Sequence, residues 1–461
     1  MQISVDVHLL SGRRVSLEIQ EDASVEELNQ RAQSALAVGK GRLLSADGHI
    51  LDAALTVKQA RIQNYDELSL QILLLPQVTA TRKGLDHIQS AFAAILGDGS
   101  VVTWGYAGYG GDSSSVQAQL KGVQHIHASS LAFAAILGDG SVVTWGDAGY
   151  GGDSSSVQAQ LKGVQHIQAS AVAFAAILGD GSVVTWGDAD CGGDSRSVQA
   201  HLKGVQHIHA SSLAFAAILS DGSVVTWGDA DCGGDSSSVQ AQLKGVQHIQ
   251  ASAVAFAAIL GDGSVVTWGD AGCGGDSSSV QAQLKGVQHI QASAVAFAAI
   301  LSDGSVVTWG DADCGGDSSS VQAQLKGVQH IQASARAFAA ILGDGSVVTW
   351  GYADYGGDSS SVQAQLKGVQ HIQASARAFA AILGDGSVVT WGDADCGGDS
   401  SSVQSQLKGV QHIQASARAF AAILGDGSVV TWGDADCGGD SSSVQAQLKG
   451  VQHKGFCCDP R

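Results

Sequence analysis

Residues 164–204 read VQHIQASAVAFAAILGDGSVVTWGDADCGGDSRSVQAHLKG, and this stretch decides the fold because nearly the same letters recur along most of the chain. Nine tryptophans mark the recurrence at a constant step of 41 residues, from Trp104 to Trp432. A fixed period of this length indicates stacked supersecondary units. We predict nine units in residues 85–450, the first of 38 residues and eight of 41, with an incomplete repeat and tail in residues 451–461.

Each unit predicts three strands. VQHIQA alternates, AFAAIL is a short apolar run and SVVTWG is rich in β-branched residues, while GDGS between the last two is typical of a tight turn. We expect Val142 and Thr144 on one face of a sheet, and Val143 and Trp145 on the other. Three strands cannot bury both faces alone, so the units are expected to stack as propeller blades. The remainder predicts a long loop with a helical turn in VQAQLKG.

The order of apolar strand, DG turn, VVTWG and glycine-bearing loop resembles the regulator-of-chromosome-condensation repeat family. The 41-residue step is similar to that of the three-strand-per-blade propellers of bacterial β-lactamase inhibitor proteins. The resemblance covers residues 85–453 and implies a mainly β fold with a β-propeller-like array. Those relatives close with seven blades, whereas this array has nine units. A closed ring, a ring with a gap and an open superhelix therefore remain alternatives.

Residues 1–74 follow another pattern. Two alternating segments around a turn at Ser11-Gly12 predict a hairpin. Ser24 followed by Glu27 predicts a capped helix start. Short strands are expected at 42–44 and 68–72, which gives the order ββαββ of a small β-grasp domain. The apolar face of the helix is predicted at Val25, Leu28, Ala32 and Ala35.

MQISV at the start, SGRRVSLEI, RLL at 42–44 and RIQNYDELSLQI at 61–72 resemble segments of ubiquitin. The resemblance implies a built-in ubiquitin-like domain, because a linker in residues 75–84 stands where ubiquitin ends in a diglycine. The recognition patch of ubiquitin would map onto Leu10, Leu44, Ser69 and Gln71, where Ser69 replaces a histidine and Gln71 an aliphatic residue. A β-grasp used only for solubility or docking through another surface is the alternative.

The charge is concentrated in the repeats. Residues 1–84 hold nine basic and ten acidic side chains, while the rest of the chain holds 15 basic and 33 acidic ones, all aspartates. An array this acidic repels phosphate backbones, so we expect no nucleic-acid partner. Aspartates placed in turns for solubility are the simplest interpretation. Short apolar runs and the lack of a secretory signal favour a cytoplasmic or nuclear protein with no membrane partner.

Two sets of loop residues are candidates for chemistry. Asp188, Asp190 and Asp194 offer carboxylates at positions 1, 3 and 7 of a loop and are weak calcium candidates, with turn capping as the alternative. Six cysteines share one repeat position with three tyrosines, so we interpret them as reduced loop thiols and not as ligands or nucleophiles. They are Cys191, Cys232, Cys273, Cys314, Cys396 and Cys437, and the tyrosines are Tyr109, Tyr150 and Tyr355.

Histidines recur on the first strand of each unit. If this strand lines a central channel, they form a pH- or metal-sensitive wall, and the alternative is packing between blades. The series is His87, His125, His166, His207, His248, His289, His330, His371, His412 and His453.

The sequence contains no nucleophile elbow, phosphate-binding loop, dinucleotide fingerprint or HExxH motif. An active site needs several different side chains, whereas these units repeat the same groups. We therefore expect a non-enzymatic protein–protein interaction adaptor without a cofactor, with ubiquitin or proteasome machinery among its partners. The alternatives are a fragment or substrate-recognition component of a HERC-type E3 ubiquitin ligase, and a guanine-nucleotide exchange regulator of a small GTPase. The 11 residues after the last unit are too few for a HECT domain.

Overall fold

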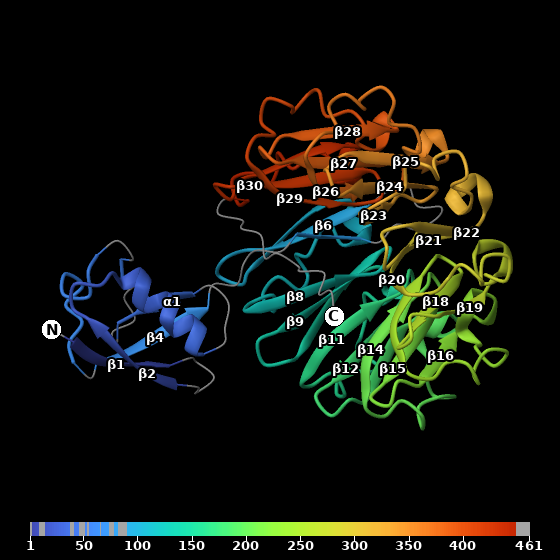
Figure 1. Cartoon of the computed structure of the whole chain (residues 1–461). Helices are drawn as coiled ribbons and strands as arrows, with labels where there is room; N and C mark the ends of the chain where they lie inside the picture. The colour runs from blue at the N-terminus through green and yellow to red at the C-terminus, as the bar shows by residue number, and fades with distance from the viewer. Residues whose placement is uncertain are drawn as a thin grey trace. The chain divides into compact units, whose positions relative to one another are not determined.

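The computed structural model describes residues 2–8, 14–36, 41–45, 51–52, 55–64, 66–72, 78–81 and 90–448. The chain divides into two compact units, and the second begins at Gln77. The fold is mainly β: a small β-grasp domain is followed by nine three-stranded sheets (Figure 1). No helix in the described part of the chain has the length and apolar character needed to cross a bilayer.

The first unit is a four-stranded sheet in the order β2-β1-β4-β3. Strands β1 (Gln2–His8) and β2 (Arg14–Gln20) form the predicted antiparallel hairpin, whose turn lies outside the described residues. Strand β4 (Glu67–Ile72) runs parallel to β1, and β3 (Gly41–Leu44) runs antiparallel to β4. This mixed sheet is the predicted β-grasp arrangement.

Helix α1 (Val25–Ala35) begins where the capping pattern predicted it. The Glu27 backbone N–H donates to Ser24 Oγ at 3.1 Å, so Ser24 satisfies one of the unpaired donors of the first turn. Val25, Leu28 and Ala32 are buried as expected, but Ala35 is exposed. Leu36 is buried in its place, because the apolar stripe continues at the i+4 position after Ala32.

Each sheet of the second unit is one blade with an inner, a middle and an outer strand, numbered blade 1 to blade 9 along the chain. The inner strands are β5 (Val78–Ala80), β8 (Val123–Ala128), β11 (Val164–Ala169), β14 (Val205–Ala210), β17 (Val246–Ala251), β20 (Val287–Ala292), β23 (Val328–Ala333), β26 (Val369–Ala374) and β29 (Val410–Ala415). The middle strands are β6 (Ala91–Ile95), β9 (Ala132–Leu137), β12 (Ala173–Leu178), β15 (Ala214–Leu219), β18 (Ala255–Leu260), β21 (Ala296–Leu301), β24 (Ala337–Leu342), β27 (Ala378–Leu383) and β30 (Ala419–Leu424). The outer strands are β7 (Val101–Gly105), β10 (Val142–Gly146), β13 (Val183–Gly187), β16 (Val224–Gly228), β19 (Val265–Gly269), β22 (Val306–Gly310), β25 (Val347–Gly351), β28 (Val388–Gly392) and β31 (Val429–Gly433).

The inner strand of blade 1 comes from the stretch that the sequence assigned to a linker. Residues 78–80 form β5, in which Val78 pairs with Ala94 and Ala80 with Phe92 of β6. The linker prediction is wrong for these residues. Without them the middle strand β6 would keep an unpaired edge of backbone N–H and C=O groups.

The loops also differ from the prediction in one respect. VQAQLKG forms successive turns, as in Val157 N–H to Ser154 C=O at 3.0 Å, and not a helix. Short helical turns instead follow the outer strands, where an aspartate side chain caps the backbone in most units. They span Ala107–Tyr109, Ala148–Tyr150, Ala189–Gly193, Ala230–Gly234, Ala271–Cys273, Ala312–Gly316, Ala353–Tyr355, Ala394–Cys396 and Ala435–Cys437 (η1 to η9).

Neighbouring blades meet through complementary surfaces. Val143 and Trp145 pack on one side of their blade and Val142 on the other, which confirms the predicted alternation. In blade 5, Phe256 stacks on Trp268 with centroids 5.1 Å apart, and Trp268 Nε1 donates to the Gly233 carbonyl oxygen of blade 4 at 3.0 Å. Gly233 has a φ of +91°, and a Cβ there would lie 2.5 Å from Phe256 Cδ2, so only glycine fits.

The nine blades close into one ring. Trp104 Nε1 of blade 1 donates to the Gly438 carbonyl oxygen of blade 9 at 3.2 Å, which repeats the bond that joins every other pair of neighbours. The inner strands β29 and β5 also contact each other, and η9 contacts β7. Of the three arrangements left open by the sequence, the structure has the closed ring.

Candidate functional site

The inner strands surround the axis of the ring, because each contacts the inner strands on both sides and β29 returns to β5. Within β11, Ile167 and Ala169 are buried in the core between blades. A register shift between Val164 and His166 marks a β-bulge in the pairing with β12. His166 and Gln168 therefore lie on the face opposite to Ile167 and Ala169, which is the face toward the axis.

The histidine series thus lines a central channel, which was one of the two alternatives. His127 and His166, on neighbouring inner strands, have ring centroids 5.2 Å apart, and so do His209 and His248. Burial, followed by the charges of neighbouring histidines, lowers the pKa of His166. The series covers His125, His166, His207, His248, His289, His330, His371 and His412, whereas His87 and His453 lie outside the described residues.

A series of seven backbone hydrogen bonds joins blades 2 to 9 at one end of this channel. In blades 2 to 8, the N–H of the second residue after the inner strand donates to the equivalent C=O of the next blade at 2.8–3.0 Å. Because each bond joins two blades, this series holds the loops in fixed positions. We call these loop residues the collar: Ser130, Ala171, Ser212, Ala253, Ala294, Ala335, Ala376 and Ala417.

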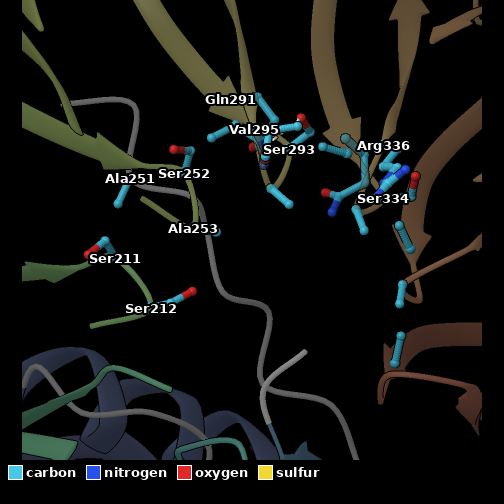
Figure 2. Close-up of a pocket in the computed structure, with 18 of the residues that line it drawn as sticks. Ser211, Ser212, Ala251, Ser252, Ala253, Gln291, Ser293, Val295, Ser334 and Arg336 are labelled. Atoms are coloured by element: carbon cyan, nitrogen blue, oxygen red, sulfur yellow. Dashed lines mark hydrogen bonds between the residues drawn. The ribbon is translucent and has the colours of Figure 1, made fainter. Parts of the chain in front are cut away.

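A cavity of about 630 Å³ opens at the collar. Its wall consists of inner-strand glutamines, such as Gln291, and of alanines and serines from the loops (Figure 2). Each glutamine amide has both donors and acceptors, and the small neighbours leave space around it. This wall can hydrogen-bond an extended chain that enters the channel.

The residue after each collar residue differs in type between two groups of blades, and in three of them, as Val295, Arg336 and Arg377, it lines the cavity. Blades 2 to 6 carry Leu131, Val172, Leu213, Val254 and Val295 there, and we call these residues the apolar arc. Blades 7 to 9 carry Arg336, Arg377 and Arg418, which we call the arginine arc. Sequence reasoning missed this division. The available signal was the change of residue type at one position of an otherwise uniform repeat.

The first two arginines of this arc converge on one aromatic ring. Arg377 Cζ lies 4.7 Å and Arg336 Cζ 5.4 Å from the centroid of Tyr355, and all three residues line the cavity. Arg377 also contacts Asp393 at 3.4 Å. Blade 7 has Tyr352 at the repeat position of Asp393, and in the described part of the chain Arg336 has no ion-pair partner.

The third arginine, Arg418, already has an ion-pair partner and is less exposed than the other two. Arg418 NH1 lies 3.1 Å from Asp434 Oδ2 of its own unit, and the arginine side chain is only 27% exposed. Arg336 and Arg377 are exposed by comparison. The positive charge that is available to a ligand therefore concentrates between blades 7 and 8.

The calcium candidates do not come together as a ligand set. Asp188 Oδ1 accepts the backbone N–H groups of Asp190 and Cys191 at 3.1 and 3.2 Å, and Asp194 forms a salt bridge with Arg196 at 2.5 Å. Among the described residues, no group of three histidine, cysteine, aspartate or glutamate side chains could hold a metal ion. Capping accounts for the positions of Asp188 and Asp194.

The cysteines are held as thiols. Burial and then the negative charge of Asp188 raise the pKa of Cys191 to about 12, and the pKa of Cys232 is also raised to about 12, mainly by burial. A thiol that stays protonated at neutral pH is a poor nucleophile. No disulfide joins the six cysteines of the array.

Half of the ubiquitin-like patch can be located. Leu44 of β3 pairs with Ser69 of β4, and both side chains are partly buried. Ser69 Oγ lies 3.0 Å from His8 Nε2. Gln71 pairs with Arg42 in the same sheet, but its side chain and the whole of Leu10 lie outside the described residues.

No protein-family profile and no curated protein sequence matches the chain. Among solved structures, it is similar to a designed protein based on ubiquitin, with 19% identity and a TM-score of 0.14 over 15% of this chain and 87% of that one. It is also similar to ubiquitin of Caldiarchaeum subterraneum, with 16% identity and a TM-score of 0.15 over 15% and 91%. The CRINKLY WD40 ectodomain of an Arabidopsis thaliana receptor kinase has 16% identity and a TM-score of 0.34 over 60% and 98%.

Proposed function

We propose that the protein is a non-enzymatic adaptor in a ubiquitin-related pathway. In this proposal the β-grasp domain binds one protein, and a ring of regulator-of-chromosome-condensation-type repeats binds another. The observation that carries the proposal is the cavity at the collar, which is lined by inner-strand glutamines together with Val295, Arg336 and Arg377. Because the collar holds these side chains in fixed positions, little conformational entropy is lost when a protein segment binds to them.

The ubiquitin-like domain would supply the second contact. Leu44 and Ser69 lie opposite each other on neighbouring strands, so an apolar and a polar side chain meet there. A receptor that binds this surface would have to bind without the histidine that Ser69 replaces. The proposal therefore favours a receptor that depends mainly on the apolar contact at Leu44.

The same pair of domains supports a second candidate. In this candidate the ring is the substrate-recognition part of a HERC-type ubiquitin ligase, whose repeats this array resembles. In that case the chain would present a substrate and would leave ubiquitin transfer to another protein. The partner bound by the β-grasp domain would then be a ligase or a conjugating enzyme.

Affinity purification of the full-length chain from native extract, read by mass spectrometry, tests the proposal. We would compare Leu44→Ser with Leu55→Ser, since Leu55 is an exposed leucine of the same domain outside the patch. The adaptor predicts that Leu44→Ser loses proteasome or ubiquitin-pathway proteins and keeps the partners of the ring. If no such protein depends on Leu44, the proposal fails. Retained ligase subunits would favour the second candidate.

A further inference from the structure

We infer that the channel mouth is a binding site for an extended peptide whose acidic side chain lies between Arg336 and Arg377. This inference rests on the proposed function and names the kind of segment that the ring would bind. The site consists of these two arginines, Tyr355 and the glutamines of the inner strands. Its occupant is a segment of another protein with a carboxylate next to apolar residues.

The arginines supply the first argument. Two guanidinium groups approach the same ring of Tyr355, at 5.4 and 4.7 Å, although like charges repel. The face of a tyrosine ring attracts cations, so Tyr355 offsets part of the cost of placing both arginines beside it. Only Asp393 pairs with either of them in the described part of the chain, at 3.4 Å from Arg377. A carboxylate placed between them would complete the neutralisation with charge-assisted hydrogen bonds.

The position of the arginines supplies the second argument. The equivalent Val254 and Leu213 pack partly against the core cluster between blades 4 and 5, so in these units the position contributes apolar contact. Arg336 and Arg377 are exposed at this position and do not make that apolar contact. They also occur in a ring whose acidic residues greatly outnumber its basic ones. A local positive site in an acidic ring is selective, because general attraction does not bring anions to the surface.

The remaining wall indicates a peptide and not a free ion. Gln291, Gln332 and Gln373 lie on successive inner strands and line the same cavity. Their amides match the donors and acceptors of an extended backbone. Val295 is half-buried and lines the same cavity, where it can contact an apolar side chain of the same peptide. A cavity of about 630 Å³ takes a segment of a few residues.

The test uses the immobilised full-length protein and a pool of random hexapeptides that are acetylated and amidated, so that every carboxylate belongs to a side chain. We expect bound peptides to be enriched in aspartate or glutamate beside apolar residues. Arg336→Gln with Arg377→Gln should remove this enrichment and weaken the selected peptides about tenfold or more. Arg196→Gln is the control, since Arg196 is an arginine of blade 3 outside the cavity whose side chain is 90% exposed.

Three outcomes would overturn the inference: no acidic enrichment, an enrichment that the double variant keeps, or the same loss in the control. A parallel pool with phosphoserine would overturn the carboxylate assignment if phosphate were preferred. Hydrogen–deuterium exchange of the double variant shows whether the ring remains folded. If the peptides bind but no ubiquitin-pathway protein depends on Leu44, the adaptor fails while this site stands; the reverse result rejects the site alone.

Discussion

Closure of the ring can be tested at Gly438. A Cβ added there would lie 2.7 Å from Phe92 Cε2 and 3.3 Å from Trp104 Nε1, and the φ of +90° is unfavourable for alanine. We expect Gly438→Ala to cost roughly 1–2 kcal/mol from the backbone and about 1–3 kcal/mol from overpacking against blade 1. The total is about 2–5 kcal/mol.

Gly409, at the end of the eighth unit, provides a matched control. Its φ is +65°, but no atom lies within 4 Å of an added Cβ, so Gly409→Ala should cost only the backbone part, about 1–2 kcal/mol. In an open array nothing would cover Gly438, and the two variants would then cost the same. The difference between them therefore measures the contact between blade 9 and blade 1.

Hydrogen–deuterium exchange is the suitable assay, because repeat arrays need not unfold in one step. The backbone amides of β6 and β7 should exchange about tenfold or more faster in Gly438→Ala than in Gly409→Ala. Equal exchange in the two variants would refute closure through Trp104 and Phe92.

Three further predictions concern the interior of the two units. Trp268→Phe should cost about 1–3 kcal/mol in denaturant unfolding, because the buried carbonyl of Gly233 loses its donor; an unchanged midpoint would contradict this role. Burial and neighbouring histidines lower the pKa of His209 to about 3, so the unfolded chain takes up a proton below about pH 6.5 before the folded one does. Stability should therefore fall as the pH drops from about 6.5 toward 3, and less so in His209→Gln, which restores the residue of most other units; parallel pH curves would reject this. Leu28→Ala should destabilise the β-grasp domain by about 2–5 kcal/mol in calorimetry and leave the transition of the ring in place, whereas a shift of both transitions would show that the units unfold together.

The strands were predictable because their cause is local. Alternation places Val143 and Trp145 together on one face, and the glycine of GDGS provides a positive φ at the turn, as at Gly140. Ring closure was not predictable, because it depends on the small rotation between blades accumulated over all nine interfaces. The contribution of residues 78–80 to blade 1 was missed for a related reason. A three-residue strand has too little pattern of its own, and only the exposed edge of β6 creates the need for it.

The same reasoning explains why the channel mouth was overlooked. A residue that every unit of a repeat shares serves a need common to all interfaces between blades. Here that need is packing, as Gly233 beside Phe256 shows. A binding site needs groups that only some blades carry, so it must be sought among departures from the consensus. Arg336 in blade 7 and Arg377 in blade 8 are such departures, and blade 7 also carries Tyr352 and Tyr355. Arg336, Arg377 and Tyr355 line one cavity, and packing does not require the arginines, because blades 2 to 6 carry apolar residues at the same position.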